Sequence, residues 1–329
     1  MPLEWVQTCC ALCGTAAGNA VLDVPHADAP GGLSRIVACT ACGLRRLDPR
    51  PGPSAIGAYY AAASGYNAYI GRRRSPRAQR LWNSLRDGFA APAGSTATAR
   101  ILRPLTRRLA AWQFDINVPL DGRRGLRVLE VGSGFGDLLI YLRSRGCEVL
   151  GTDLSAAATA KAHEYGVEVK VGNLAELGLP SARFDVAVLC HSLEHLPDPN
   201  VELAELARLL RPGGRLHIAV PNGHAVRLDL EGVNWAHLSH PLHFWFFDGE
   251  TLGQLLARHG FQPLAPPRTT TRHHALAGWR HETRTVGWSV ATRRFLRFLA
   301  ASWRRADGGD VLRLVAELRP DGRSPARLS

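Results

Sequence analysis

Residues 128–136 read VLEVGSGFG, and this stretch decides how the rest of the chain is interpreted. It begins with an apolar run that contains Glu130, as in a buried strand, and glycines follow at alternate positions. Glycine lets the backbone turn sharply and approach a ligand closely, because it has no Cβ. A helix expected over 136–145 would point its N-terminal amides at whatever lies over the turn. The pattern predicts a strand, a turn and a helix that form a ligand-binding edge.

A second strand, expected over residues 148–152, ends in Asp153. A carboxylate at that point, after a strand–helix–strand unit, is placed to accept hydrogen bonds from the two hydroxyls of a ribose. The glycines alone would also fit an ordinary connection between a strand and a helix. The glycine turn and Asp153 together therefore indicate a cofactor that carries a nucleoside.

The order E-x-G-x-G-x-G resembles motif I of class I S-adenosylmethionine-dependent methyltransferases. Further segments follow in the order that this family shows. Asn173 stands where the family often has Asp beside the adenine, and residues 184–190 resemble its fourth strand. An LEHL segment follows at 193–196, and the RPGG turn at 211–214 leads into a fifth strand at 215–220.

The resemblance implies an α/β fold with a seven-stranded Rossmann-like methyltransferase sheet. Its third strand is expected over 167–171, its sixth begins at Phe261, and its seventh spans 310–319. A helix is expected over 250–259, with Asp248 as its N-cap. The implied cofactor is S-adenosyl-L-methionine. The residues expected to bind it are Glu130, Gly132, Ser133, Gly134, Gly136, Asp153, Leu154, Asn173, Leu174 and His191.

Methyl transfer to a hydroxyl or an acidic C–H needs a base near its operating pKa. The candidates are His195, His237, His240 and His243. His195 follows the fourth strand, at the carboxyl end of the sheet, where open α/β folds bind ligands. The other three recur every third residue in a histidine- and aromatic-rich loop over 224–247, part of which resembles the family's HxxHF stretch. For these three, metal binding, substrate contact, general-base work and structural hydrogen bonding remain open.

Two C-x-x-C pairs lie near the N-terminus, Cys10 with Cys13 and Cys39 with Cys42. Four thiolates make a closed tetrahedral zinc site, and the gap between the pairs is rich in proline and glycine. The pattern predicts a zinc ribbon over residues 1–50. Cys9 adjoins Cys10 and could replace it as a ligand, although the spacing favours Cys10. A closed site leaves no position for a substrate, so we assign this Zn²⁺ to folding.

Residues 51–122 are expected to form a basic helical linker or lid, and residues 123–329 the methyltransferase domain. The linker contains tyrosines that could cover a ligand or pack a helix on the core, and arginine-rich helical segments over 75–86 and 98–112. Before it, the DPRP segment at 48–51 resembles the NPRP segment of zinc-ribbon methyltransferases that act on sugars and related metabolites.

The chain carries a formal net charge of +12, but the charge is unevenly distributed. Residues 72–127 hold thirteen arginines against three aspartates, whereas residues 128–210 hold six basic and twelve acidic residues. Such a basic collar would attract an anionic substrate, an acidic lipid surface or RNA; solvated arginine faces are the alternative. No apolar run approaches the roughly 20 residues of a membrane-spanning helix, and the N-terminus lacks the order of a secretory signal. A cytoplasmic protein is expected.

We therefore predict an enzyme that transfers a methyl group from S-adenosylmethionine to a small, anionic acceptor. A nucleotide sugar, a glycan precursor or a natural-product intermediate would fit. One alternative is methylation of a base in ribosomal RNA, which the arginine collar favours. The other is a catalytically silent scaffold that binds the cofactor, for which Asn173 leaves room.

Overall fold

The structure is a computed structural model that describes residues 4–62, 116, 118–120, 123–270, 279, 283, 287–304 and 307–320. Most of the predicted linker therefore lies outside the described residues. The same holds for its two arginine-rich helices and for Tyr66 and Tyr69. Within the described ranges, no helix is both long and apolar enough to cross a bilayer.

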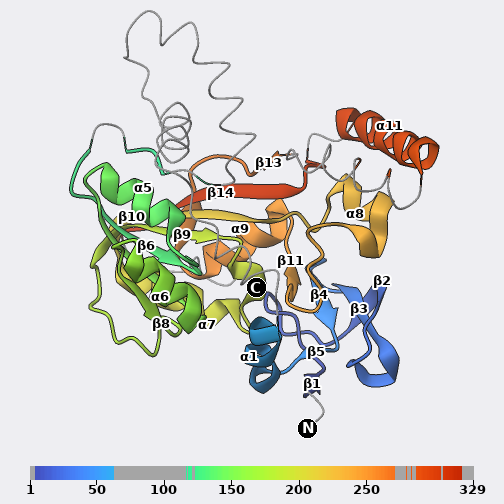
Figure 1. Cartoon of the computed structure of the whole chain (residues 1–329), viewed down its shortest axis with the longest axis horizontal. Coiled ribbons are helices and arrows are strands. Elements are labelled where there is room, and N and C mark those ends of the chain that lie inside the picture. The colour runs from blue at the N-terminus through green and yellow to red at the C-terminus, as the bar shows by residue number, and fades with distance from the viewer. Residues whose placement is uncertain are drawn as a thin grey trace, which may run out of the picture.

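A large mixed sheet forms the centre of the described chain (Figure 1). Its parallel strands are β6 (Arg127–Val131), β7 (Glu148–Asp153), β8 (Val169–Val171), β9 (Phe184–Cys190) and β10 (Leu210–Pro221). Two antiparallel strands complete one edge, β14 (Val311–Leu318) beside β10 and β12 (Phe261–Pro263) beside β14. The strand order is β12-β14-β10-β9-β6-β7-β8. The predicted seven-stranded Rossmann-like sheet is thus confirmed.

The sheet has one strand more than the sequence predicted. β13 (Arg268–Thr270) pairs with β14 at Val311, whereas β12 pairs with it near Leu318. β14 is eight residues long, so the short β12 covers only part of its outer edge. β13 covers the remainder and supplies partners for backbone groups that an open edge would expose.

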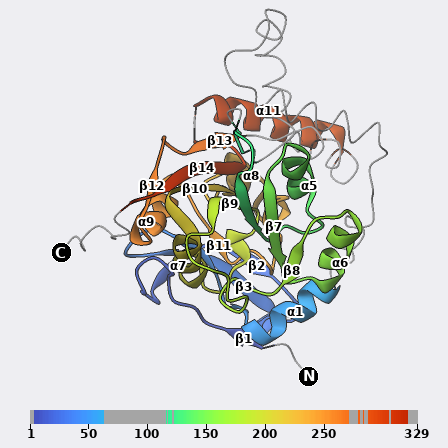
Figure 2. The same ribbon diagram turned by 90° about the vertical axis from the view of Figure 1, so that its left-hand side faces the viewer.

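Helices cover both faces of the sheet, and Figure 2 shows α5 and α6 on one side with α7 and α9 on the other. Their bounds are α5 (Asp137–Ser144), α6 (Ala156–Glu164), α7 (Pro199–Leu209) and α9 (Gly249–Arg258). Alternate strand residues point to opposite faces. In β9, Val186 and Val188 pack in the cluster that contains α5, whereas Ala187 and Leu189 pack in the cluster that contains α7 and α9. β9 is therefore buried on both faces, as its continuous apolar run predicts.

The predicted cap of α9 is confirmed. The Asp248 carboxylate accepts a hydrogen bond from the Thr251 N–H at 2.8 Å, which satisfies one of the donors exposed in the first turn. The remaining helices are α1 (Pro53–Ala62), α8 (Val226–Glu231) and α11 (Trp288–Arg304), and the short 3₁₀ turns are η1 (Pro30–Gly32), η2 (Leu193–His195) and η3 (Gly232–Asn234).

The N-terminal strands form a second sheet that includes one strand from much later in the chain (Figure 1). Its order is β11-β4-β3-β2, and its strands are β2 (Gly18–Pro25), β3 (Leu33–Cys39), β4 (Arg45–Asp48) and β11 (Trp245–Phe246). Trp245 pairs with Arg46 in antiparallel register. A separate pair joins β1 (Trp5–Val6) to β5 (Arg50–Pro51). The ribbon and the histidine-rich loop therefore share one sheet.

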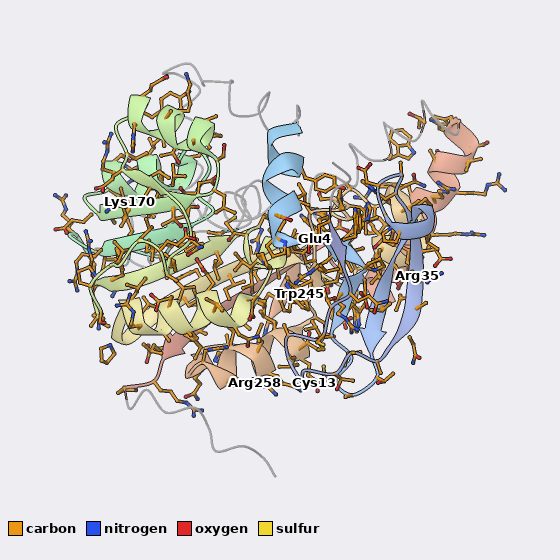
Figure 3. All side chains as sticks on the ribbon, turned by 90° about the horizontal axis from the view of Figure 1, so that it is seen from below. Glu4, Cys13, Arg35, Lys170, Trp245 and Arg258 are labelled. Carbon is orange, nitrogen blue, oxygen red and sulfur yellow. The ribbon has the colours of Figure 1, made fainter. Side chains whose placement is uncertain are left out.

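Side chains also tie the ribbon to the parallel-sheet domain. Figure 3 labels Trp245 between the two parts, and its indole N–H donates to the Leu196 carbonyl at 2.8 Å. On the other side, the Asn200 amide donates to the Ala11 carbonyl at 2.9 Å and its oxygen lies 3.0 Å from His259 Nε2. Residue 11 lies within the first C-x-x-C pair, so this contact docks that pair against α7 and α9.

Asp185 clamps the amino ends of three parallel strands. Its carboxylate accepts hydrogen bonds from the Arg127 N–H at 2.9 Å and from the Arg211 guanidinium at 2.6 Å. Burial alone would raise the pKa of Asp185, but the hydrogen bonds from Arg127 and Arg211 outweigh it and hold the pKa below its usual 3.8.

The variant Asp185→Asn is expected to lower the free energy of unfolding by about 1–3 kcal/mol at pH 7, because its amide NH₂ would face a donor, either the Arg127 N–H or the Arg211 guanidinium. A carboxylate with a depressed pKa stabilises the fold above its unfolded-state pKa, and that stability is lost as the pH falls through the folded-state pKa. The difference between wild type and variant should therefore shrink below pH 4 in urea titrations. Glu168→Gln, at a carboxylate that is 61% exposed, is the control and should change stability by less than about 0.5 kcal/mol. An equal effect of both substitutions would contradict the clamp.

Candidate functional site

The glycine turn after β6 adopts a backbone that only glycine accepts readily. Gly132, Gly134 and Gly136 have φ values of 71°, 55° and 78°, in the left-handed region that disfavours other residues. A Cβ on Gly132 would lie 2.7 Å from Ser192 Cβ, and one on Gly136 would lie 2.7 Å from Val167 Cγ2. The turn is therefore packed closely against the segment that follows β9.

The carboxyl end of β7 holds this turn in place. The Thr152 carbonyl accepts hydrogen bonds from the Gly132 and Ser133 N–H groups at 2.8 and 3.0 Å. The Asp153 carboxylate accepts one from the Gly134 N–H and one from the Ser155 N–H, both at 2.8 Å. Asp153, expected only to meet a ligand, thus also anchors the glycine turn.

Two apolar side chains next to Asp153 are exposed. Leu154 is 57% exposed and Val171, at the end of β8, is 50% exposed. Asn173 follows them, and its side-chain oxygen accepts a hydrogen bond from the Glu176 N–H at 3.1 Å. Leu174 is fully buried. A flat apolar group bound beside Asp153 would cover Leu154 and Val171, which fits the adenine of a nucleoside.

At the carboxyl end of β9, the chain brings His191 to a buried carboxylate. His191 has a φ of 54°, and its Nδ1 lies 3.4 Å from Glu194 Oε1. Its ring stacks on that of His237, with centroids 5.9 Å apart and an angle of 12° between the planes. Glu130, on the neighbouring β6, is also buried. The sequence assigned no role to Glu194, although it lies inside the LEHL segment.

His195 and His243 form a second ring pair and pack against each other. Their ring centroids lie 4.4 Å apart and the rings are nearly perpendicular. His195 Nδ1 lies 3.0 Å from the Leu242 carbonyl, and His243 Nδ1 lies 2.8 Å from the His237 carbonyl. Because a carbonyl only accepts, Nδ1 carries the proton in each ring and Nε2 keeps its lone pair. Burial lowers the pKa of both histidines below the usual 6.5, which favours the neutral form of each ring.

His240 is separate from the other candidates. Its ring packs on that of His26, with centroids 4.8 Å apart, and its centroid lies 6.3 Å from that of Trp5. Both neighbours belong to the ribbon. Burial lowers the pKa of His240 to about 4. The three histidines that recur every third residue therefore do not gather around one point.

The four predicted zinc ligands do come together. The sulfur atoms of Cys10, Cys13, Cys39 and Cys42 all lie within 4.8 Å of one another. Cys10 Sγ lies 3.4 Å from Cys42 Sγ, and Cys13 Sγ lies 3.3 Å from Cys39 Sγ. A zinc ion with sulfur ligands at about 2.3 Å places its ligands roughly 3.8 Å apart. The cluster fits a tetrahedral ion.

Arg50, in the DPRP segment, links the ribbon to both histidine-bearing segments. It donates to the Pro197 carbonyl at 2.7 Å, and its guanidinium lies 4.7 and 4.9 Å from the ring centroids of Phe244 and Trp245. The sequence motif drew attention to this segment, but only the structure shows what Arg50 contacts.

The sequence is similar to those of known methyltransferases. A family model described as "Methyltransferase domain" matches residues 96–265, more than half of the chain. A ubiquinone biosynthesis O-methyltransferase of Alkalilimnicola ehrlichii is 38% identical over 112 residues, 31% of this chain and 44% of that protein. A probable S-adenosylmethionine-dependent methyltransferase of Mycolicibacterium smegmatis is 36% identical over 143 residues, 42% of this chain and 52% of that protein. The chain thus spans about half the length of these relatives.

Among solved structures, an S-adenosylmethionine-dependent methyltransferase from Mesorhizobium loti is similar, with 22% identity and a TM-score of 0.43 over 59% of this chain and 91% of that one. The family match covers more than half of the chain. The chain therefore belongs to the methyltransferase domain family.

Proposed function

We propose that this protein transfers a methyl group from S-adenosylmethionine to a hydroxyl of a small acceptor. The observation that carries the proposal is the position of the glycine turn. The Gly134 N–H donates a hydrogen bond to the Asp153 carboxylate, and Gly132 packs against Ser192, which follows His191 in the sequence. This contact brings the predicted cofactor residues and the segment after β9 to one edge of the sheet. That edge is where open α/β sheets bind ligands.

Different residues of the chain would bind the cofactor and remove the acceptor's proton. The glycine turn and Asp153 would hold the amino-acid and ribose parts of the cofactor, and Leu154 and Val171 would cover its adenine. When bound, S-adenosylmethionine supplies a methyl group on a sulfonium sulfur, which keeps the electrons of the broken C–S bond as the acceptor oxygen forms the new bond. The stacked pair His191 and His237 would take the acceptor's proton.

Of the four histidines predicted as bases, His237 fits this role best. It stacks on His191 and its side chain is partly exposed although its Nε2 is buried, whereas His243 is 5% exposed and His240 faces the ribbon. A base must reach the proton that it removes, which argues against His243 and His240 as the base.

We propose a hydroxyl as the acceptor because several relatives are named ubiquinone biosynthesis O-methyltransferases. An anionic metabolite, such as a nucleotide sugar, a glycan precursor or a natural-product intermediate, remains the substrate class that the charge distribution favours. We further propose that Cys10, Cys13, Cys39 and Cys42 bind a structural Zn²⁺ in a ribbon over 1–50, with the linker at 51–122 and the methyltransferase domain at 123–329.

The experiment that tests this function is transfer of labelled methyl groups. The purified protein is incubated with methyl-labelled S-adenosylmethionine and an extract of cells that lack its gene, and the extract is then fractionated. Label in small anionic molecules, absent with the Asp153→Ala variant, is the expected result. Label that RNase releases would show that the acceptor is RNA and not a metabolite. Binding of S-adenosylmethionine without any methyl transfer would favour the catalytically silent scaffold.

A further inference from the structure

Glu194 is a buried carboxylate whose nearest reported polar neighbour is His191 Nδ1, 3.4 Å from its Oε1. Its side chain is fully buried. Within the part of the chain that the structure describes, neither of its carboxylate oxygens accepts a hydrogen bond. Removing an ionised carboxylate from water costs several kcal/mol unless opposite charge compensates it. His191 compensates this charge only when its ring is protonated, whereas a bound cation would compensate it directly.

Two histidines present nitrogen atoms to this carboxylate. Glu194, His195 and His243 each offer one ligand atom, and these atoms all lie within 4.8 Å of one another. Both histidines direct Nδ1 to a backbone carbonyl, of Leu242 and of His237. Histidine ligands of metals are commonly oriented in this way, with one nitrogen hydrogen-bonded and the other on the ion.

The fold holds these residues together independently of any ligand. Glu194 and His195 belong to η2, directly after β9, and His243 immediately precedes Phe244. The Phe244 N–H donates to the Glu194 carbonyl at 2.8 Å, which fixes the loop against η2. The cluster therefore combines two segments about 50 residues apart in one rigid arrangement.

We propose that Glu194, His195 and His243 form a second metal site, which binds a divalent first-row transition ion. Two imidazole nitrogens and one carboxylate oxygen suit Mn²⁺, Fe²⁺, Co²⁺ or Zn²⁺ better than Mg²⁺ or Ca²⁺, which prefer oxygen ligands. Three protein ligands leave coordination positions open for a substrate, in contrast to the closed four-thiolate site.

The open positions define the role of this ion, and that role rests on the proposed function. The acceptor's hydroxyl oxygen would bind the ion, which lowers the pKa of the hydroxyl. The O–H bond breaks and its proton passes to the stacked pair His191 and His237. The oxygen lone pair then forms the bond to the methyl carbon of S-adenosylmethionine, and the C–S electrons remain on sulfur.

The test uses the full chain with zinc already bound to its cysteines, titrated with Mn²⁺ and followed by electron paramagnetic resonance. Thiolates held by Zn²⁺ do not compete for Mn²⁺, which stands lowest in the affinity order. We expect one Mn²⁺ per chain with pulsed-resonance modulations from two imidazole ¹⁴N nuclei. Glu194→Gln should raise the Mn²⁺ dissociation constant by at least about tenfold. His240→Gln, in the same loop but outside the cluster, should leave it unchanged.

Absence of bound Mn²⁺ in the wild-type protein, or binding without ¹⁴N modulations, would overturn the site without relying on any variant. Equal affinity in wild type and Glu194→Gln would do the same and would indicate that a protonated histidine compensates the carboxylate. Methyl transfer and cofactor binding are measured on the same samples. Mn²⁺ binding without transfer would reject the proposed function and keep the site, whereas transfer unaffected by loss of the ion would reject its role.

Discussion

Replacing Gly132 with alanine is expected to weaken S-adenosylmethionine binding at least about tenfold more than replacing Gly125 does. The two glycines flank β6 and have nearly the same φ, 71° and 69°. A left-handed backbone costs an alanine about 1–2 kcal/mol at either position. Only at Gly132 does the new Cβ meet an obstacle, Ser192 Cβ at 2.7 Å, whereas nothing lies within 4 Å of a Cβ on Gly125. The clash adds about 1–3 kcal/mol and displaces the turn from Asp153.

Calorimetric titration with S-adenosylmethionine measures the dissociation constants of the two variants. Thermal unfolding serves as the control that both variants are folded. A second substitution identifies the cause. Ser192→Gly removes the Cβ that the new methyl group meets, so the double variant should recover most of the lost affinity, as expected for coupled neighbours. If Gly132→Ala binds the cofactor as tightly as Gly125→Ala, the glycine turn is not the cofactor site.

The second large effect is expected at the ribbon. Cys39→Ser should abolish zinc binding and unfold the ribbon, because Cys39 is buried in the four-sulfur cluster. Binding of a structural zinc contributes about 10–16 kcal/mol, which is comparable to the whole stability of a typical domain. Zinc content by mass spectrometry should fall by one ion per chain. Amide hydrogen exchange should rise in β3 and β4, and also in β11, which pairs with β4.

Cys9→Ser is the matched control, since Cys9 adjoins Cys10 but is exposed and outside the cluster. It should retain the ion and the exchange protection. Retention of zinc by Cys39→Ser, or unchanged protection in β11 after its loss, would contradict a structural role for the metal.

The sequence predicted the parts of the fold that depend on local patterns. Continuous apolar runs identified β6, β7 and β9, and the C-x-x-C spacing identified four thiols that do gather. Capping chemistry likewise placed the start of α9 at Asp248. Each of these signals lies within a few residues, so no knowledge of distant partners was needed.

The parts that the sequence missed depend on contacts between distant segments. β11 and β13 contain two and three residues, too few to show a period, and exist only because β4 and β14 offer free edges. The histidines of the 224–247 loop were equally unpredictable. In an irregular loop, the regular spacing of the histidines along the sequence does not determine where their side chains point. His240 therefore packs on the ribbon, whereas His243 packs against His195. Glu194 stood in a known motif, but only the structure shows that its carboxylate is buried.

The pairing of β4 with β11 has a consequence for how the protein is made. The ribosome synthesises β4 about 200 residues before its partner strand β11, so the β4 edge of the nascent ribbon stays unpaired during that time. An open edge can pair with other chains, and early zinc capture would limit that risk by holding β3 and β4 in place. Transplanting the ribbon to another enzyme would likewise require moving residues 245–246 with it. The ribbon sheet is therefore built from two stretches of sequence that lie far apart in the chain.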